Sequence, residues 1–243
     1  MNTAGRRTTR IRLRWVVWLF AAFMFPRCSF SQQDYVGRFD IYNGFTYFDS
    51  PDIHLSQRGY HLQLGYNTKT WLALGFDYSV ATGTLNLTSN LLKPSLDASI
   101  QAELEPLILA GVVPPNFQLS VPTSSTTQTF AAGPQFEYRH FRYVTLFIRP
   151  SIGAIREVAT PHPGDPISAL IVKSLAPSGS KTEWTGFYGF GGGAEVNVWA
   201  HVSIRMQADF VHNDLFTDIL KSARNTTRLS IGPAFHFGKN IAQ

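Results

Sequence analysis

The sequence is poor in cysteine, in charged residues and in long apolar runs. Its single cysteine is Cys28, so we expect neither disulfides nor thiol chemistry in the chain beyond residue 31. Charged residues make up 15% of the 243, whereas an average globular chain has about 25%. The apolar run from Trp15 to Pro26 is shorter than the roughly 20 residues that a membrane-spanning helix needs. A bundle of membrane helices is therefore not expected.

Residues 1–31 have the layout of a secretory signal peptide. Arginines precede the apolar run, and the small residues Ser29 and Ser31 follow it, which is the usual order of basic region, apolar region and cleavage site. We predict cleavage after Ser31, and the alternative is an uncleaved helical anchor. Acylation of Cys28 would be a lipoprotein feature, but Arg27 stands where such a site has a small residue.

The basic character of the chain comes from this segment. Residues 1–31 hold six of the 21 Lys and Arg and none of the 16 Asp and Glu, so residues 32–243 carry 15 against 16 and a net charge of −1. The sequence pI of 9.4 therefore does not indicate nucleic acid or anionic lipid as a partner. Nucleic-acid motifs are absent and the seven histidines are scattered. We predict no cofactor, no metal and no nucleic-acid partner.

Apolar and polar residues alternate over most of residues 35–237. The segment Thr70–Val80, for example, has an apolar side chain at every second position, and a period of two predicts a β-strand. Most of these segments reach the 9–11 residues that a transmembrane strand needs. Eight such segments occur, near residues 35–48, 56–66, 69–82, 124–139, 143–157, 184–198, 201–214 and 226–237.

The connections between these segments alternate in length. Those after the second, fourth and sixth segments are tight, whereas the others are mostly longer and cover residues 49–55, 83–123, 158–183 and 215–225. This is the layout of outer-membrane barrels. We predict that residues 32–243 form one domain, an all-β, eight-stranded, antiparallel up-and-down transmembrane β-barrel with long extracellular loops. A soluble barrel or sandwich would also alternate, but aromatic residues near the strand ends favour the membrane form.

The polar faces of the predicted strands carry large charged side chains of both signs. An eight-stranded barrel is just wide enough for side chains to fill it, and a buried charge needs a partner. We therefore predict that the lumen holds an interlocked network of arginines and acids, and the alternative is a selective pore. The predicted members are Arg38, Asp40, Asp77, Glu137, Arg139, Arg149, Glu195, Arg205, Asp209 and Arg228.

The last predicted strand carries a short motif. Ser230, Gly232, Phe235 and Phe237 occupy the positions of a polar residue, a glycine and two aromatic residues in the C-terminal assembly signature of outer-membrane barrels. Residues 32–243 thereby resemble the small OmpA-type outer-membrane β-barrels, with the barrel domain alone. The resemblance implies export through the periplasm to a Gram-negative outer membrane, contact with its lipid, and recognition by the barrel-assembly machinery. The chain continues to Gln243, whereas many members of this family end on the aromatic residue.

The loops at residues 83–123 and 158–183 are the candidate contacts for an extracellular ligand. The first contains an expected helix that Ser95 caps, Pro106 kinks and Gly111 follows. This helix either covers the barrel mouth or touches the lipid headgroups. One of its faces is apolar and consists of Leu96, Ile100 and Leu104.

The second loop contains four prolines around an apolar stretch at residues 167–175. Prolines restrict the conformations of a chain, so we expect a semi-rigid loop. It would serve as a partner surface or as protection against proteolysis.

The predicted function is a structural or surface-interaction role without enzymatic activity. The alternatives are a narrow porin for small solutes and, with less support, a lipid-modifying enzyme. Such a hydrolase would use a His and a Ser oriented by a carboxylate, and His54, Ser56 and Asp52 have a compatible spacing.

One stretch matches the glycine-rich turn of dinucleotide-binding folds, from Gly189 to Ala194. That turn opens a helix, whereas the residues after Ala194 alternate as a strand does. We therefore predict that these glycines lie within a strand. There they would make room on the lumen face for a bulky neighbour such as Arg149 or Arg205.

Overall fold

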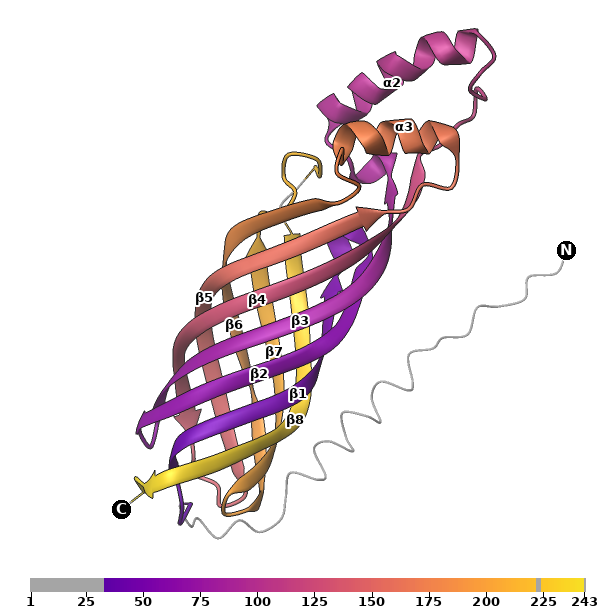
Figure 1. The fold of residues 1–243 in the computed structure, drawn as a ribbon. Helices are drawn as coiled ribbons and strands as arrows, with labels where there is room; N and C mark the ends of the chain where they lie inside the picture. The colour runs from indigo at the N-terminus through magenta and orange to yellow at the C-terminus, as the bar shows by residue number, and fades with distance from the viewer. Residues whose placement is uncertain (1–32, 222–223, 243) are drawn as a thin grey trace, which may run out of the picture.

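The computed structural model describes residues 33–221 and 224–242, and the predicted signal peptide and its cleavage site lie outside them. Eight antiparallel strands form a closed barrel in which each strand pairs with its sequence neighbours and the last pairs with the first (Figure 1). The predicted fold class is confirmed. The strands are β1 (Gly37–Ser50), β2 (Leu55–Lys69), β3 (Leu72–Thr88), β4 (Ser120–Tyr138), β5 (Val144–Pro161), β6 (Lys181–Trp199), β7 (Val202–Asn213) and β8 (Arg224–Asn240).

The alternation of side chains places the apolar face outside. On β3, Leu74 and Phe76 are 53% and 48% exposed, whereas Asp77 and Ser79 are 1% and 0% exposed. A soluble barrel would have the reverse arrangement, because a continuous apolar outer surface is costly in water. Large aromatic side chains also lie on the outer surface near the strand ends, and they include Tyr66, Trp71, Tyr138, Tyr143, Trp184 and Trp199.

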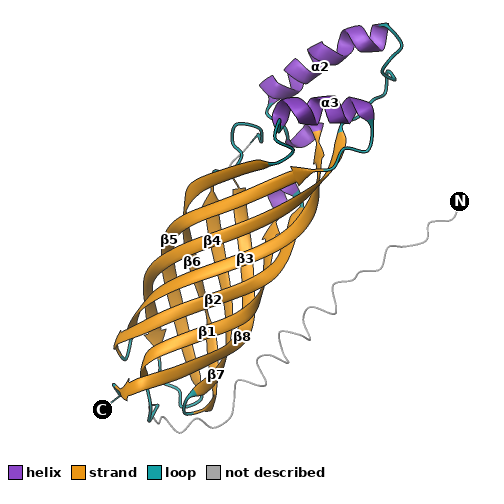
Figure 2. Cartoon of the chain, in the orientation of Figure 1, coloured by secondary structure: helices purple, strands orange, loops and turns teal. Residues whose placement is uncertain are grey.

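The two ends of the barrel differ. Short turns join β2 to β3, β4 to β5 and β6 to β7 at one end, which we call the turn end. The other end carries the helices and is called the helix end (Figure 2). Here the β3–β4 ladder runs on to the pair Thr88 and Ser120, so the loop predicted at residues 83–123 is shorter than expected. Serines and threonines form much of this extension, and the apolar alternation therefore ends before the strands do.

The helix end carries two short 3₁₀ turns, η1 (Pro51–Ile53) and η2 (Ser89–Leu91), and the predicted helix of the first long loop. This helix, α2 (Pro94–Leu109), contains Pro106 and is followed by Gly111 with a φ of 72°. The predicted cap at Ser95 is wrong. Proline has a φ suited to the first helical position, so Pro94 starts the helix and Lys93 precedes it without a side-chain capping bond.

The second long loop also contains a helix, α3 (Pro166–Leu175), where we predicted only a semi-rigid loop. The Asp165 carboxylate accepts the backbone N–H groups of Ile167 and Ser168 at 3.0 and 2.8 Å. These bonds satisfy two amides that lack partners within the helix. The pair Asp165 and Pro166 was thus an available start signal in the sequence.

Helices α2 and α3 pack against each other beyond the ends of β3, β4 and β5, and we call this unit the helical lobe (Figure 1). Among the described residues, no helix is both long and apolar enough to cross a bilayer. The buried residues that hold the lobe together are Leu92, Ile100, Leu104, Val113, Leu119, Val121, Ile171 and Val172. The lobe therefore has its own small core, separate from the lumen.

Candidate functional site: the lumen and its helix end

The middle of the lumen contains a cluster of two carboxylates and two guanidiniums from four strands. Arg228 on β8 lies 3.2 Å from the Asp77 carboxylate and 2.8 Å from that of Asp209. Arg149 on β5 pairs with the same two acids. All four side chains are at most 3% exposed. Because each acid contacts both arginines, the cluster ties together strands on different sides of the barrel.

His61 on β2 borders this central cluster. Its Nε2 lies 3.6 Å from the Asp77 carboxylate, and its Nδ1 lies 3.1 Å from the hydroxyl of Ser230. Ser230 in turn contacts the hydroxyl of Thr46 at 3.0 Å. These polar contacts thus connect the central ion pairs to side chains of β1 and β2.

A second cluster lies toward the turn end around Arg205 on β7. Its guanidinium lies 3.1 Å from Asp40 and 2.8 Å from Glu195. Glu195 also pairs with His236 and accepts the Ser203 hydroxyl at 2.6 Å. The guanidinium is within 5.5 Å of the ring centroids of two inward aromatic residues, Tyr42 and Phe147.

Amide side chains extend the polar packing to the turn end. Gln63 donates to Gln135 at 3.0 Å, and Gln135 donates to Glu137 at 2.7 Å. Glu137 pairs with Arg139, which also donates to the side chain of Gln33 at 3.1 Å. These contacts connect β2 and β4 to the segment that precedes β1.

Arg38 does not join these clusters, and its predicted role there is wrong. It is only partly buried, and it donates to the Tyr66 hydroxyl at 3.4 Å and to the Asn67 carbonyl at 3.5 Å. The ladder between β1 and β8 shifts register between Gly37 and Phe39. This irregularity interrupts the alternation at the position of Arg38.

The prediction missed a further ion pair at the helix end, between Glu157 on β5 and Arg224 on β8. Both are 2% exposed, and Arg224 donates to Glu157. Ser125 donates to the same carboxylate at 2.7 Å. Glu157 has the inward parity of Arg149, so the alternation could have identified it. Arg224 precedes the predicted last strand and could not be placed.

The lumen also contains an apolar layer near the helix end, which the sequence analysis did not predict. The layer interrupts the polar inner face, because several inward positions on the strands hold aliphatic or aromatic residues. Its buried members are Ile53, Leu55, Leu91, Ala131, Ile155, Phe187, Val211, Leu215, Phe216 and Leu220. A water-filled path through the barrel would have to cross this layer.

The glycines of β6 lie within the strand, and no helix follows Ala194. Their neighbours differ from those predicted. A methyl group at Gly191 would meet the Asp209 carboxylate, and one at Gly193 would lie 2.8 Å from the Phe147 ring. The glycines thus make room for an acid and an aromatic ring, and not directly for Arg149 or Arg205.

The four signature residues lie on β8, the first two with inward parity and the two aromatic residues on the outer face. Ser230 points inward, and Gly232 packs closely against the backbone of β1. Phe235 and Phe237 lie on the outer surface, 47% and 43% exposed. The strand continues to Asn240.

The three residues considered for hydrolysis are not arranged as a catalytic group. His54 is exposed in a left-handed turn, and Ser56 donates to Asp49 at 3.2 Å. Asp52 accepts a backbone N–H from Asn225. In the described ranges, no group of three or more His, Cys, Asp or Glu side chains could hold a metal ion.

Sequence comparisons find no relative, since no protein-family model and no curated protein matches the chain. Solved structures do match. Neisserial surface protein A has a TM-score of 0.52 at 11% identity over 83% of this chain and 99% of its own. Ail of Yersinia pestis, solved with the heparin analogue sucrose octasulfate, has 0.47 at 13% identity over 83% and 99%. OprG of Pseudomonas aeruginosa has 0.46 at 10% identity over 86% and 99%.

The first of these scores exceeds 0.5, and it agrees with the strand number, the pairing order and the outward apolar face described above. The chain has the fold of the small, eight-stranded, OmpA-type outer-membrane β-barrels.

Proposed function

We propose that this protein is an outer-membrane barrel with a filled lumen, whose activity is a surface interaction at its helix end. The observation that carries the proposal is the inner packing. The ion-pair cluster around Arg228 links β8 to β3 across the lumen, and the cluster around Arg205 links β6, β7 and β1; an apolar layer lies between them and the helix end. A barrel built in this way is a rigid support for the segments that it displays.

The proposed orientation rests on the lengths of the connections. In outer-membrane barrels the short turns are periplasmic and the long loops are extracellular. The helical lobe would then lie outside the cell, and the signature on β8 would contact the assembly machinery from the periplasmic side. Export through the periplasm and insertion into outer-membrane lipid belong to the same proposal.

A narrow porin is the second candidate, and the structure gives it less support. A conducting lumen normally needs 16–18 strands, and here the inner side chains are largely paired with one another. An enzymatic role is not part of the proposal, since Ser56 donates to Asp49 and Asp52 accepts from the backbone of Asn225.

Planar-bilayer recording of the purified protein tests the filled lumen. We expect a closed baseline for the wild type. We also expect it for a variant in which a short turn replaces residues 93–119, which removes α2 and keeps Leu91 of the apolar layer, because the lumen and not the lobe would close the barrel. Steady conductance of the wild type would favour the porin. Conductance of the truncated variant alone would show that the lobe is the closure and would contradict our proposal.

A further inference from the structure

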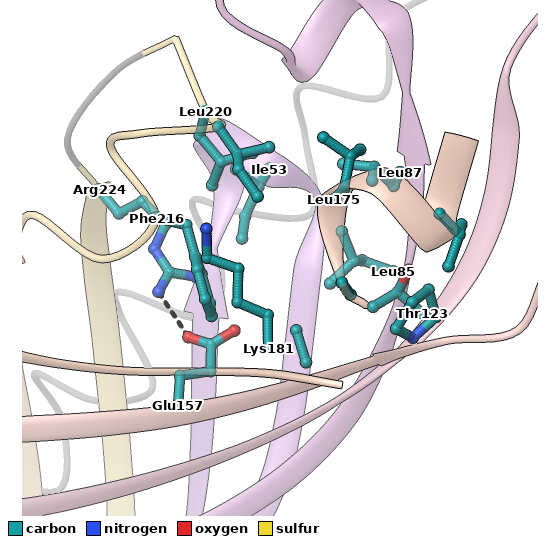
Figure 3. Close-up of a pocket in the computed structure, with 15 residues that line it drawn as sticks. Ile53, Leu85, Leu87, Thr123, Glu157, Leu175, Lys181, Phe216, Leu220 and Arg224 are labelled. Atoms are coloured by element: carbon teal, nitrogen blue, oxygen red, sulfur yellow. Dashed lines mark hydrogen bonds and ion pairs between the residues drawn. The ribbon is translucent and has the colours of Figure 1, made fainter. Parts of the chain in front are cut away.

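Pockets lie at both ends of the barrel, and their linings differ in chemistry. The pocket at the helix end is apolar (Figure 3), and its charged residues are already paired, Arg224 with Glu157 and Lys181 with Asp218. The pocket at the turn end has a volume of about 240 Å³ and a more polar lining. It is larger than the cavity of roughly 150 Å³ that binds benzene in another protein. We call it the turn-end pocket.

Three segments form the turn-end pocket. They are the residues before β1, the turn between β4 and β5, and the end of β6. Gln33 and Arg139 both line it, and Arg139 donates to the Gln33 side chain at 3.1 Å. Gln33 also donates to Thr145 at 2.8 Å, and Arg139 pairs with Glu137. This part of the lining therefore belongs to the packed lumen, and its polar groups are already engaged.

Two opposite charges line the same pocket without contacting each other. Arg142 and Asp34 both belong to the lining, and among the described residues neither side chain forms a hydrogen bond or an ion pair. The guanidinium carbon of Arg142 lies 5.4 Å from the centroid of the Tyr143 ring. The carbonyl of Asp34 accepts from the side chain of Asn240 at 3.0 Å, which fixes its backbone. An arginine and an aspartate held apart in one pocket suit a ligand with an anionic and a cationic group.

The turn-end pocket reaches the outer surface of the barrel at the aromatic belt. Tyr143 and Trp199 line the pocket and are exposed, and such side chains lie at the level of the lipid headgroups. Val198 lines it as well and is exposed, like Val196 on the same strand. A lipid whose chains contact these valines would therefore have its headgroup at the pocket.

We propose that the turn-end pocket binds the headgroup of a phospholipid that carries a phosphate and a primary ammonium, as phosphatidylethanolamine does. Arg142 would hold the phosphate, because a guanidinium can donate two parallel hydrogen bonds to it. Asp34 would accept from the ammonium, and the face of Trp199 would favour the same positive charge. This site lies at the opposite end from the proposed surface interaction. Its failure would leave the filled lumen intact, because conductance tests that separately.

The test uses the full-length barrel in phosphatidylcholine nanodiscs, with the indole N–H signals of Trp199 and Trp71 followed by NMR. An increasing fraction of phosphatidylethanolamine should shift the Trp199 signal saturably. Trp71 is also exposed at the turn end but does not line the pocket, so its signal should stay in place. Phosphatidylglycerol lacks the ammonium and should reach half-saturation at a several-fold higher fraction. Equal responses of the two tryptophans would indicate general contact with lipid and overturn the proposal.

Variants separate the two charges of the pocket. Arg142→Gln should raise several-fold the fraction of phosphatidylethanolamine needed for half-saturation. Asp34→Asn should remove the preference for phosphatidylethanolamine over phosphatidylglycerol. Lys69→Gln is the matched control, because Lys69 is an exposed cation at the turn end, 5.5 Å from the Trp71 ring centroid and outside the pocket. Wild-type affinity and preference in both pocket variants would refute the site.

A soluble headgroup distinguishes a lipid from a free ligand. Glycerophosphoethanolamine has the same two charges but no acyl chains, so added in solution it should not shift the Trp199 signal saturably. A response equal to that of phosphatidylethanolamine would identify the ligand as a soluble zwitterion and contradict the lipid site.

Discussion

At the scale of single residues, the strongest constraints are close approaches inside the lumen. Gly191 on β6 lies against the Asp209 carboxylate, and that acid is held by Arg228 on the neighbouring strand. A small inward residue at this position is therefore a requirement of the ion-pair cluster. Gly186 on the same strand faces outward, and among the described residues a methyl group there would meet just one carbonyl oxygen, at 3.9 Å.

We expect Gly191→Ala to destabilise the barrel by about 1–3 kcal/mol, the usual cost of inserting a methyl group into a packed interior. Gly186→Ala should leave stability unchanged. Urea unfolding of both variants in lipid vesicles, followed by tryptophan fluorescence, gives the comparison. Equal free energies of unfolding for the two variants would show that the packing around Gly191 accommodates the added methyl group without cost.

At the scale of elements, the helical lobe behaves as a unit with its own core. Leu104 of α2 is 6% exposed and packs in this core, whereas Leu109 at the end of the same helix is 83% exposed. The lobe contacts the strand extensions and residues 219–220, whereas the pairing that closes the barrel is between strands alone.

Leu104→Ala should therefore loosen the lobe alone. Truncating a buried leucine typically costs about 2–5 kcal/mol, so we expect faster limited proteolysis within residues 89–119. The unfolding of the barrel should be unaffected. Leu109→Ala is the control and should be cleaved at the wild-type rate. A destabilised barrel in Leu104→Ala would show that the lobe and the strands unfold together.

The start of α3 should respond to acid. Hydrogen bonds from Ser168, and then from the backbone N–H of Ile167, hold the pKa of the Asp165 carboxyl below its ordinary value. A carboxyl with a lowered folded pKa stabilises the fold above its unfolded pKa, and this contribution is lost as the pH falls through the folded pKa.

We therefore expect the first turn of α3 to open below about pH 4, the ordinary range of an aspartate. Amide hydrogen exchange at Ile167 and Ser168 would report this opening as reduced protection. Asp165→Ala should show reduced protection already at neutral pH, and Asp165→Ser should restore much of it through its hydroxyl. Protection that is independent of pH in the wild type would refute the capping role.

At the scale of the whole molecule, the ion-pair clusters in the lumen stabilise the closed barrel. The pairs around Arg228 join β3, β7 and β8, so their effect should appear in the stability of the entire barrel. Backbone hydrogen bonds join neighbouring strands and close the sheet. The inner charges add contacts between strands that are not neighbours, such as β3 and β8.

The unboiled wild type should resist SDS and run at a different gel position from the boiled protein. Arg228→Met should lose this form at a lower temperature, because removing one partner of buried ion pairs costs about 3–5 kcal/mol. Arg58→Met, at an exposed position on β2, should melt as the wild type does. The absence of any heat-dependent shift in the wild type would contradict the membrane barrel itself.

Much of the fold was predictable because a strand has a short period. A residue such as Asp77 between Phe76 and Tyr78 has its face fixed by its neighbours alone. The same parity identified nine of the ten predicted lumen charges as inward residues in or next to the strands. It failed at Arg38, where the ladder shifts register, and at Arg224, which lies beyond the apolar alternation.

The sequence by itself determined where the eight strands lie and which residues of a strand share a face, since both follow from neighbours one or two positions apart. Only the tertiary structure decided the partners. Asp77 and Arg228 are 151 positions apart, and closure of the barrel brings them together. The apolar layer likewise depends on contacts between distant segments. Such contacts leave no periodic pattern in the sequence, because the packing that stabilises them exists only once the sheet has closed.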